Sequence, residues 1–205
     1  MTDHLRSEMP GLRFLATVAL FACFALSNGA AQTAEQPKTQ PDIPAQYAAA
    51  AFGQSGSVAG KSFGLTVYVQ ELTSDGEIEE LEATLKHKGP DGLVNALEDL
   101  KDKGRVAPTG SLGTGMRVVR IHLTKDGGQH IVLATNRPIS FGELYNGTRS
   151  RDYKFGIVVL NVDKDGKGTG LFAPLCKVKF NKKNELEIEH SGQKPFRLAN
   201  VYRQK

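Results

Sequence analysis

The sequence has little cysteine, with two residues of this type in a chain of 205. Cys23 falls in a segment that we predict to be removed, so the mature chain keeps Cys176 alone and forms no internal disulfide. An exported domain without disulfides must be stabilised by its hydrophobic core. Because Cys176 has the strand parity of Val178 and Phe180, we predict a buried, unpaired thiol rather than a nucleophile.

The chain also lacks an apolar run long enough to cross a bilayer. Its apolar run from Phe14 to Leu26 has 13 residues, whereas a membrane-spanning helix needs about 20. Basic residues precede this run and small residues such as Gly29 follow it, which is the order of a secretory signal peptide. We predict that residues 1–31 are a signal peptide cleaved after Ala31. The mature protein is then periplasmic or extracellular, and not an integral membrane protein; an uncleaved membrane anchor is the alternative.

A strong excess of charge of one sign is missing as well. The formal net charge is +4, and removal of residues 1–31 takes two basic and two acidic residues away, which leaves it unchanged. One basic cluster stands out, at Lys177, Lys179, Lys182 and Lys183. Aromatic side chains of the kind that stack on nucleic-acid bases are not interleaved with it, except for Phe180, which has core parity. We predict a lysine-guarded strand edge and no nucleic-acid partner.

The residue sets of common enzymes and cofactor sites are also missing. Glycines 110, 113 and 115 resemble a phosphate-binding loop, but no Lys-Ser or Lys-Thr pair follows them. No paired nucleophile and base is evident either. We therefore predict no cofactor.

Two patterns resemble metal sites without completing them. Residues 161–166 have the oxygen ligands that open a calcium-binding loop, but position twelve, which needs Glu, is Phe172. We predict a hairpin turn instead. His122 and His130 flank a turn signal at residues 126–127, and a two-residue turn would place them on opposite faces. We therefore predict no metal site there.

The mature chain begins with a segment rich in Pro, Ala, Gly, Ser and Gln, at residues 32–60, which predicts a flexible linker. A single domain follows over residues 61–205. Its first strand, at residues 62–69, alternates apolar and small or polar residues. Ser74 and Glu77 then form a capping box, which marks the start of a helix.

Two glycines, Gly89 and Gly104, predict two helix ends, so we expect a helical hairpin over residues 74–103. Pro90 suits the first turn of the second helix. Four leucines are expected to pack this hairpin on the sheet: Leu81, Leu85, Leu93 and Leu97.

From Met116 onward the apolar period returns to two residues, with short connections that force antiparallel neighbours. Residues 153–162 are apolar at both parities, which predicts a central strand, and Pro174 predicts a bulge or an edge. We predict an α+β fold: a single antiparallel β meander of about seven strands, barrel-like or sandwich-like, with the helical hairpin inserted after the first strand.

Several short motifs occur in an order that resembles a family of exported bacterial proteins without an assigned activity. They are Gly-Pro-Asp-Gly-Leu at 89–93, Gly-Ser-Leu-Gly at 110–113, Thr-Asn-Arg-Pro-Ile at 135–139, Arg-Ser-Arg-Asp-Tyr at 149–153, Asp-Gly-Lys-Gly at 165–168 and Arg-Leu at 197–198. The resemblance covers about residues 62–203 and implies an exported single domain without implying a reaction. Asn136 departs from the family pattern, which usually has Asp at this position.

The longest break in the predicted meander, between Arg137 and Tyr153, concentrates charged and aromatic residues. Binding residues gather in such loops on rigid scaffolds, and arginines grip anionic groups. The candidate ligand-binding residues are Arg137, Glu143, Tyr145, Arg149, Arg151 and Asp152. Ion pairs that anchor the loop are the structural alternative.

We therefore predict an exported, non-enzymatic domain that binds a cell-envelope ligand or protein. The alternative is an envelope-associated hydrolase with Glu143 and Asp152 as paired carboxylates. A structural component of the envelope is a third interpretation.

Overall fold

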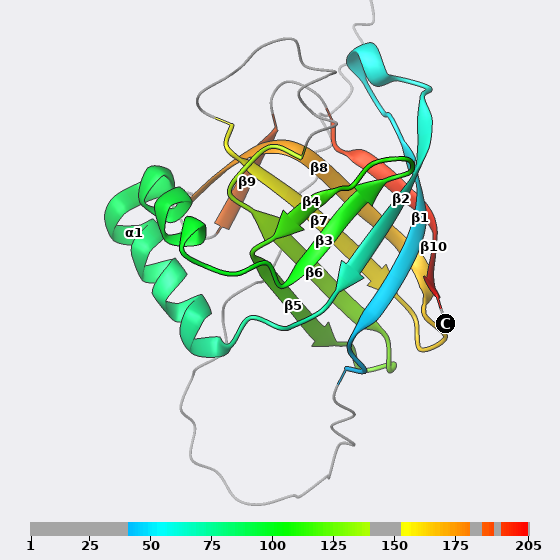
Figure 1. Cartoon of the computed structure of the whole chain (residues 1–205). Helices are drawn as coiled ribbons and strands as arrows, with labels where there is room; N and C mark the ends of the chain where they lie inside the picture. Colours follow the sequence, from blue (N-terminus) through cyan, green and yellow to red (C-terminus); the bar gives the residue numbers. More distant parts are fainter. Residues whose placement is uncertain (1–40, 140–152, 181–185, 191–193, 205) are drawn as a thin grey trace, which may run out of the picture. The chain divides into compact units, whose positions relative to one another are not determined.

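The computed structural model describes residues 41–139, 153–180, 186–190 and 194–204. They belong to one compact unit, residues 36–205, shown in Figure 1. The predicted signal peptide lies outside the described residues. The elements are, in chain order, β1 (Ala45–Phe52), η1 (Gly56–Val58), β2 (Ser62–Val69), α1 (Asp75–Glu98), β3 (Gly104–Pro108), β4 (Thr114–Met116), β5 (Val118–Leu123), β6 (Gln129–Thr135), β7 (Phe155–Val162), β8 (Lys167–Phe180), β9 (Leu186–His190) and β10 (Phe196–Gln204).

The strands form one antiparallel sheet that nearly closes into a barrel (Figure 1). Its order is β4-β3-β2-β1-β10-β8-β7-β6-β5, and β9 pairs with β8 off this path. β4 and β5 are separated by Arg117 alone; β4 pairs with β3, and β5 pairs with β6. The amide of Arg117 donates to the carbonyl of Ala134 at 2.9 Å. Residues 114–123 thus link the two ends of the sheet in one bent run, which gives the barrel-like arrangement. The predicted meander of about seven strands is wrong, because the described residues form a sheet of ten strands in which β1 pairs with β10. The helical element follows the second strand of the sheet, not the first.

The prediction of a flexible linker over residues 32–60 is wrong for the part that forms β1. This strand pairs with β2 along its whole length and with β10 on its other side. Its inward side chains Ala45, Tyr47, Ala49 and Ala51 are buried. Alanine at both parities conceals the alternation, and alanine is rare in strands. Here the small side chains fit beneath larger ones inside the barrel.

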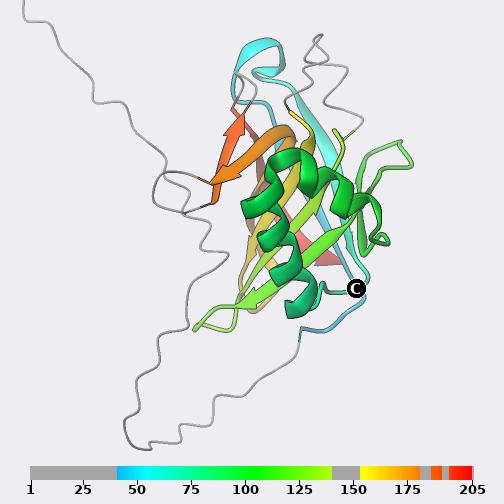
Figure 2. The ribbon, with the colours of Figure 1, turned by 90° about the vertical axis from the view of Figure 1, so that its left-hand side faces the viewer.

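The predicted helical hairpin is also wrong, because residues 75–98 form the single element α1. Gly89 has φ 68° and ψ −168°, a left-handed conformation that glycine adopts at little cost. It bends the element without a connecting loop, so the second half does not fold back along the first. Figure 2 shows this change of direction. The capping box at Ser74 and Glu77 is confirmed. No helix in the described ranges has the length and apolar content of a membrane span.

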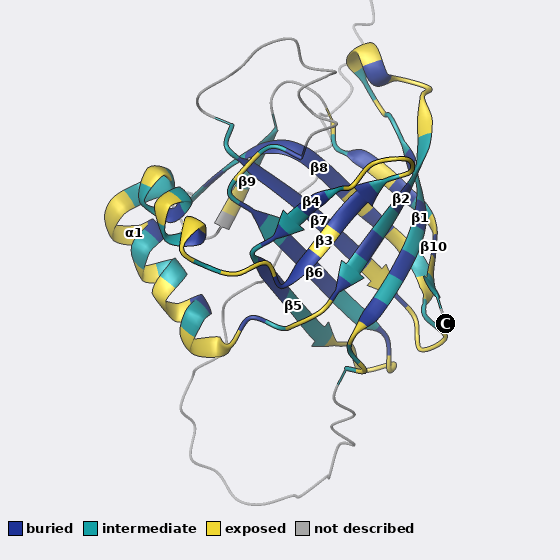
Figure 3. Cartoon of the chain, viewed as in Figure 1, coloured by how far each residue is buried: buried dark blue, intermediate teal, exposed yellow. Residues whose placement is uncertain are grey.

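The barrel interior is filled by side chains. Inward residues from every side of the sheet are between 0 and 1 % exposed, among them Leu65, Val67, Val119, Ile131, Leu133, Leu160 and Leu198. Figure 3 shows buried stretches along the strands. Because these side chains are shielded from solvent, they leave no open lumen among them. The interior is therefore a core rather than a ligand cavity.

A second apolar layer lies between α1 and the outside of the sheet. The buried face of α1 consists of Ile78, Leu85, Leu93 and Leu97, and Figure 2 shows α1 lying across the strands.

Cys176 in β8 is fully buried and unpaired, as predicted, and burial raises the pKa of its thiol to about 12. The predicted bulge at Pro174 is confirmed, because two residues of β8, Pro174 and Leu175, lie opposite the single residue Gly156 of β7.

Candidate functional site

Arg137 is the one predicted site residue that lies within the described ranges. It follows β6 and is exposed. The other five, Glu143, Tyr145, Arg149, Arg151 and Asp152, lie outside the described residues. So do both carboxylates of the hydrolase alternative. The described residues on either side of residues 140–152 therefore define the candidate site.

The chain around Arg137 is tied to the second half of α1 by two side-chain contacts. The Asn136 amide nitrogen donates to the carbonyl of Val94 at 3.2 Å. After residues 140–152 in the sequence, the Lys154 ammonium contacts the Asp91 carboxylate at 2.7 Å. Both contacts reach α1 just beyond Gly89, so the bend in the helix sets where the ends of β6 and β7 are held.

The other side of the segment is tied to the hairpin of β8 and β9. The Tyr153 hydroxyl donates to Glu189 Oε1 at 3.1 Å, and the Lys179 ammonium contacts Glu189 Oε2 at 2.9 Å. The hydrogen bond from Lys179, followed by that from Tyr153, lowers the pKa of the Glu189 carboxyl. Glu189 therefore stays ionised at neutral pH and holds both partners.

At Ile139, the last described residue before position 140, the backbone is held by buried contacts. The Ile139 amide donates to the carbonyl of Pro174 at 3.0 Å, within the bulge of β8. A Cβ at Gly156 would lie 2.6 Å from Ile139 Cγ1, so no larger residue fits opposite this side chain. Nearby, the Thr135 hydroxyl is buried without a hydrogen-bond partner among the described residues. The base of the segment is thus rigid.

These contacts bring together residues that lie in or directly beside three of the motifs on which the family resemblance rests: Asp91 and Val94 of α1, Asn136, and Lys154. Residues 89–93, 135–139 and 149–153 are far apart in the sequence, and the described parts of them meet at one end of the barrel. We call this place the α1–β6–β7 junction and define it by Asp91, Asn136, Arg137, Tyr153 and Lys154. The ion pair of Asp91 with Lys154 was not predicted, although both residues stand in or beside motifs that had been noted.

The calcium-like pattern forms a hairpin turn, as predicted. Asp163 Oδ1 accepts hydrogen bonds from the amides of Asp165 and Lys167, each at 2.9 Å. The carboxylate thus closes the β7–β8 turn itself. Across the described residues, no group of three or more His, Cys, Asp and Glu side chains is placed to hold a metal ion.

The prediction that His122 and His130 lie on opposite faces is wrong. The β5–β6 loop is closed by Thr124 and Gly128, so it is longer than a two-residue turn. The resulting register pairs His122 directly with His130, with ring centroids 6.4 Å apart. A shift of one residue in register moves a side chain to the other face of a sheet, and the two imidazoles therefore share the outer face.

The glycine-rich segment at residues 110–113 connects β3 to β4. Its Leu112 is 89 % exposed. Arg105 donates to the carbonyl of Leu112 at 3.3 Å and lies over the Tyr68 ring. This segment is a hairpin tip rather than a phosphate loop.

A buried lysine, Lys103, lies near the start of α1 and was not predicted from the sequence. The Lys103 ammonium contacts both Glu71 and Glu77 at 3.1 Å, and its side chain is 6 % exposed. The same Glu77 belongs to the capping box, so Lys103 fixes the helix start against β3. These contacts serve the fold.

Comparison with known proteins identifies no relative: no model of a protein family, no curated protein and no solved structure matches the chain.

Proposed function

We propose that the mature chain is an exported, non-enzymatic domain that binds an anionic group of a cell-envelope ligand or protein. One observation carries the proposal: three distant segments are held together by side-chain contacts at the α1–β6–β7 junction, with the exposed Arg137 beside them. A rigid base beside an exposed guanidinium is the arrangement that grips a carboxylate or phosphate with two hydrogen bonds.

The packed barrel interior supports an external site. Barrels that carry ligands inside need a lumen, whereas the inward side chains here fill the core. Among the described charged groups of the junction, Lys154 is paired with Asp91, so Arg137 is the cation best placed for an outside partner. Export is proposed on the order of residues in the first 31 positions.

The test is a thermal-shift and titration series on residues 32–205 with defined anionic probes. They are inorganic phosphate, succinate, soluble peptidoglycan fragments, and vesicles with and without anionic phospholipid. We expect one probe to bind, and Arg137→Ala to weaken it at least tenfold, since a hydrogen bond to a charged group contributes about 1.5–3 kcal/mol. The melting temperature without probe should change little, because Arg137 is exposed.

Arg105→Ala is the matched control, because Arg105 is an exposed arginine on β3, away from the junction. Its binding should equal that of the wild type. Binding that survives Arg137→Ala, or falls equally in both variants, would show that the junction is not the site.

A further inference from the structure

β5 and β6 carry a pair of histidines that lie directly opposite each other across the two strands. His122 and His130 face each other on the outer surface, with ring centroids 6.4 Å apart and ring planes inclined by 35°. Asn161 of β7 is the next residue in the same cross-strand row. β5, β6 and β7 can be followed in Figure 1.

The contact with Asn161 selects one tautomer of His130. Nδ1 of His130 lies 2.6 Å from Oδ1 of Asn161. An amide oxygen accepts and does not donate, so Nδ1 carries a proton, and in the neutral ring with this tautomer Nε2 has the lone pair. Histidines that bind metals are commonly oriented in this way, with the second nitrogen donating to an oxygen.

His122 offers a nitrogen that the protein leaves without a partner. Its Nε2 is buried and makes no hydrogen bond within the described structure. Burial, followed by the charges of Arg120 and His130, lowers the pKa of the imidazole, while Asp75 acts in the opposite direction.

Arg120 is the cation nearest in sequence, and its charge is already engaged. One guanidinium nitrogen contacts Asp75 Oδ1 at 2.7 Å and another donates to the Thr73 carbonyl at 2.8 Å. The carboxylate offsets the repulsion that Arg120 would exert on a bound cation. The start of α1 thus balances the charge beside the histidine pair.

We propose that His122 and His130 bind one divalent transition-metal ion between them, with water completing the coordination. Imidazole pairs suit Cu²⁺, Ni²⁺ and Zn²⁺, in contrast to the oxygen ligands that Ca²⁺ and Mg²⁺ require. Bonds from zinc to histidine nitrogen are about 2.0–2.1 Å long, so both imidazoles must turn a ring nitrogen toward the shared ion. Two protein ligands leave open positions, so the ion is exchangeable.

Isothermal titration of the metal-free chain with Cu²⁺ and Zn²⁺ at pH 7.5 tests the site. We expect one ion per chain, with Cu²⁺ bound more tightly. His122→Ala and His130→Ala should each weaken binding more than tenfold, and Asn161→Ala should weaken it about 10- to 100-fold by releasing the orienting contact. Binding should fade below about pH 6.5, where imidazoles take up protons.

His87→Ala is the matched control, because His87 is an exposed histidine on α1, and it should bind as the wild type does. If His122→Ala does not fold, the nitrogen hyperfine pattern of bound Cu²⁺ in the wild type and in His130→Ala decides, since the variant should lose one nitrogen. No binding at 1 mM metal (roughly the weakest affinity that counts as a site), or binding unaffected by His130→Ala, would overturn the proposal. The result is independent of the anion site at Arg137.

Discussion

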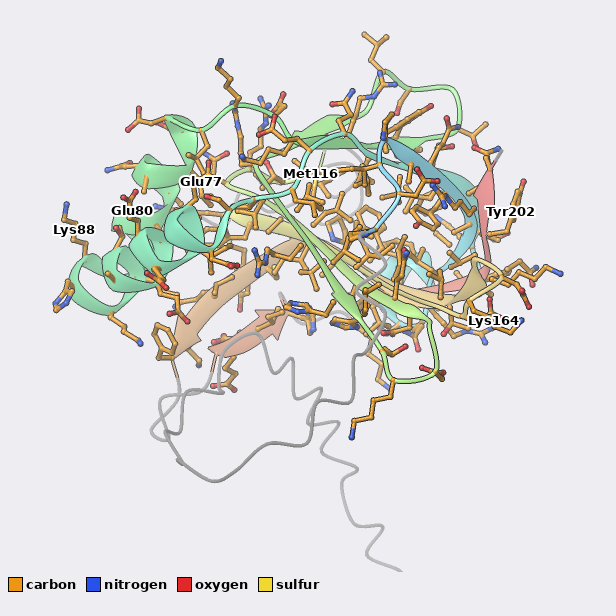
Figure 4. All side chains as sticks on the ribbon, turned by 90° about the horizontal axis from the view of Figure 1, so that it is seen from below. Glu77, Glu80, Lys88, Met116, Lys164 and Tyr202 are labelled. Carbon is orange, nitrogen blue, oxygen red and sulfur yellow. The ribbon has the colours of Figure 1, made fainter. Side chains whose placement is uncertain are left out.

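The outside of the barrel has two unlike faces. Next to α1, the outward side chains Val132, Ile157 and Val159 are 7, 7 and 9 % exposed, close to core values. On the face of β10, β1, β2 and β3, the outward positions include Ala48 and Thr66, which are half-buried, and other residues that are open to solvent. Figure 4 shows Glu80 and Lys88 of α1 on one side of the molecule and Tyr202 of β10 on the other.

The two faces differ in how the outward side chains of the sheet are shielded from solvent. On the covered face, large aliphatic residues gain burial from α1 and add a second apolar layer to the molecule. On the uncovered face, small residues such as Ala48 and Thr66 stand beside the half-exposed Tyr202, and no helix covers them, so this face contributes little beyond its backbone pairing. Stability should therefore depend strongly on side chains of the covered face and weakly on those of the other.

The largest expected difference is in thiol reactivity. Cys176 lies on the covered side with its thiol buried and its pKa raised to about 12, so labelling of the native protein should follow global opening. We expect the labelling rate of the native protein to be lower than the rate in denaturant by at least about 10³-fold. A Tyr202→Cys, Cys176→Ala variant presents a thiol on the uncovered face and should react rapidly. Fast labelling of native Cys176 would show that the layer beneath α1 opens locally.

Truncation of a helix leucine should produce the largest loss of stability. Leu97 is 2 % exposed, so Leu97→Ala should lower the free energy of unfolding by about 2–5 kcal/mol in urea titrations. Thr66→Ala on the uncovered face should change it by less than about 0.5 kcal/mol. Equal effects at the two positions would contradict the contrast between the faces.

Removal of the helix cap should have a smaller effect. The Ser74 hydroxyl accepts from the Glu77 amide, and the Ser74 amide donates to Glu77. Ser74→Ala should cost about 0.5–2 kcal/mol. Ser111→Ala removes a hydroxyl of the β3–β4 loop that donates to the carbonyl of Pro108 and should cost less. A larger effect at Ser111 would mean that this loop, not the start of α1, limits stability.

The smallest effect should come from acid. Burial lowers the pKa of His122 and of His190, which lie on β5 and β9. A lowered pKa in the folded state means that the unfolded chain binds more protons below pH 6.5, so stability is full above that pH and falls as the pH drops through the folded pKa. Urea titrations at pH 7.5 and 5.5, with chelator present, should show this loss. His122→Asn should reduce this loss of stability between pH 7.5 and 5.5. If the loss is the same in the variant, groups other than His122 cause it.

Strands with clear alternation were predictable from the sequence, and those made of small residues were not. β2, β5, β6, β7 and β8 have apolar residues at one or both parities and were identified. β1 and β3 consist largely of alanine, glycine and proline, whose strand propensity is low; neighbours in the barrel supply the burial that makes them strands. Gly89 and Pro90 marked the bend in α1, but a bend signal does not specify the direction of the next segment.

The candidate sites depended on details that local patterns do not contain. The separation of His122 from His130 is compatible with either face, and only the closure of the loop at Thr124 and Gly128 decides the register. The contacts of Asp91 with Lys154 and of Asn136 with α1 join residues more than 40 positions apart, and they follow from the tertiary arrangement. Arg137 was identified because it stands at the edge of the longest break.

The pairing of β1 with β10 sets an order of events during synthesis. These strands are neighbours within the sheet, with Gln46 opposite Gln204, although they lie at the two ends of the domain. A chain that lacks its final strand therefore holds an open sheet with the edges of β1 and β8 unpaired, and such edges invite association. The domain completes its fold only after its last residues are made, so a C-terminal truncation of a few residues acts on the middle of the sheet and not on its margin.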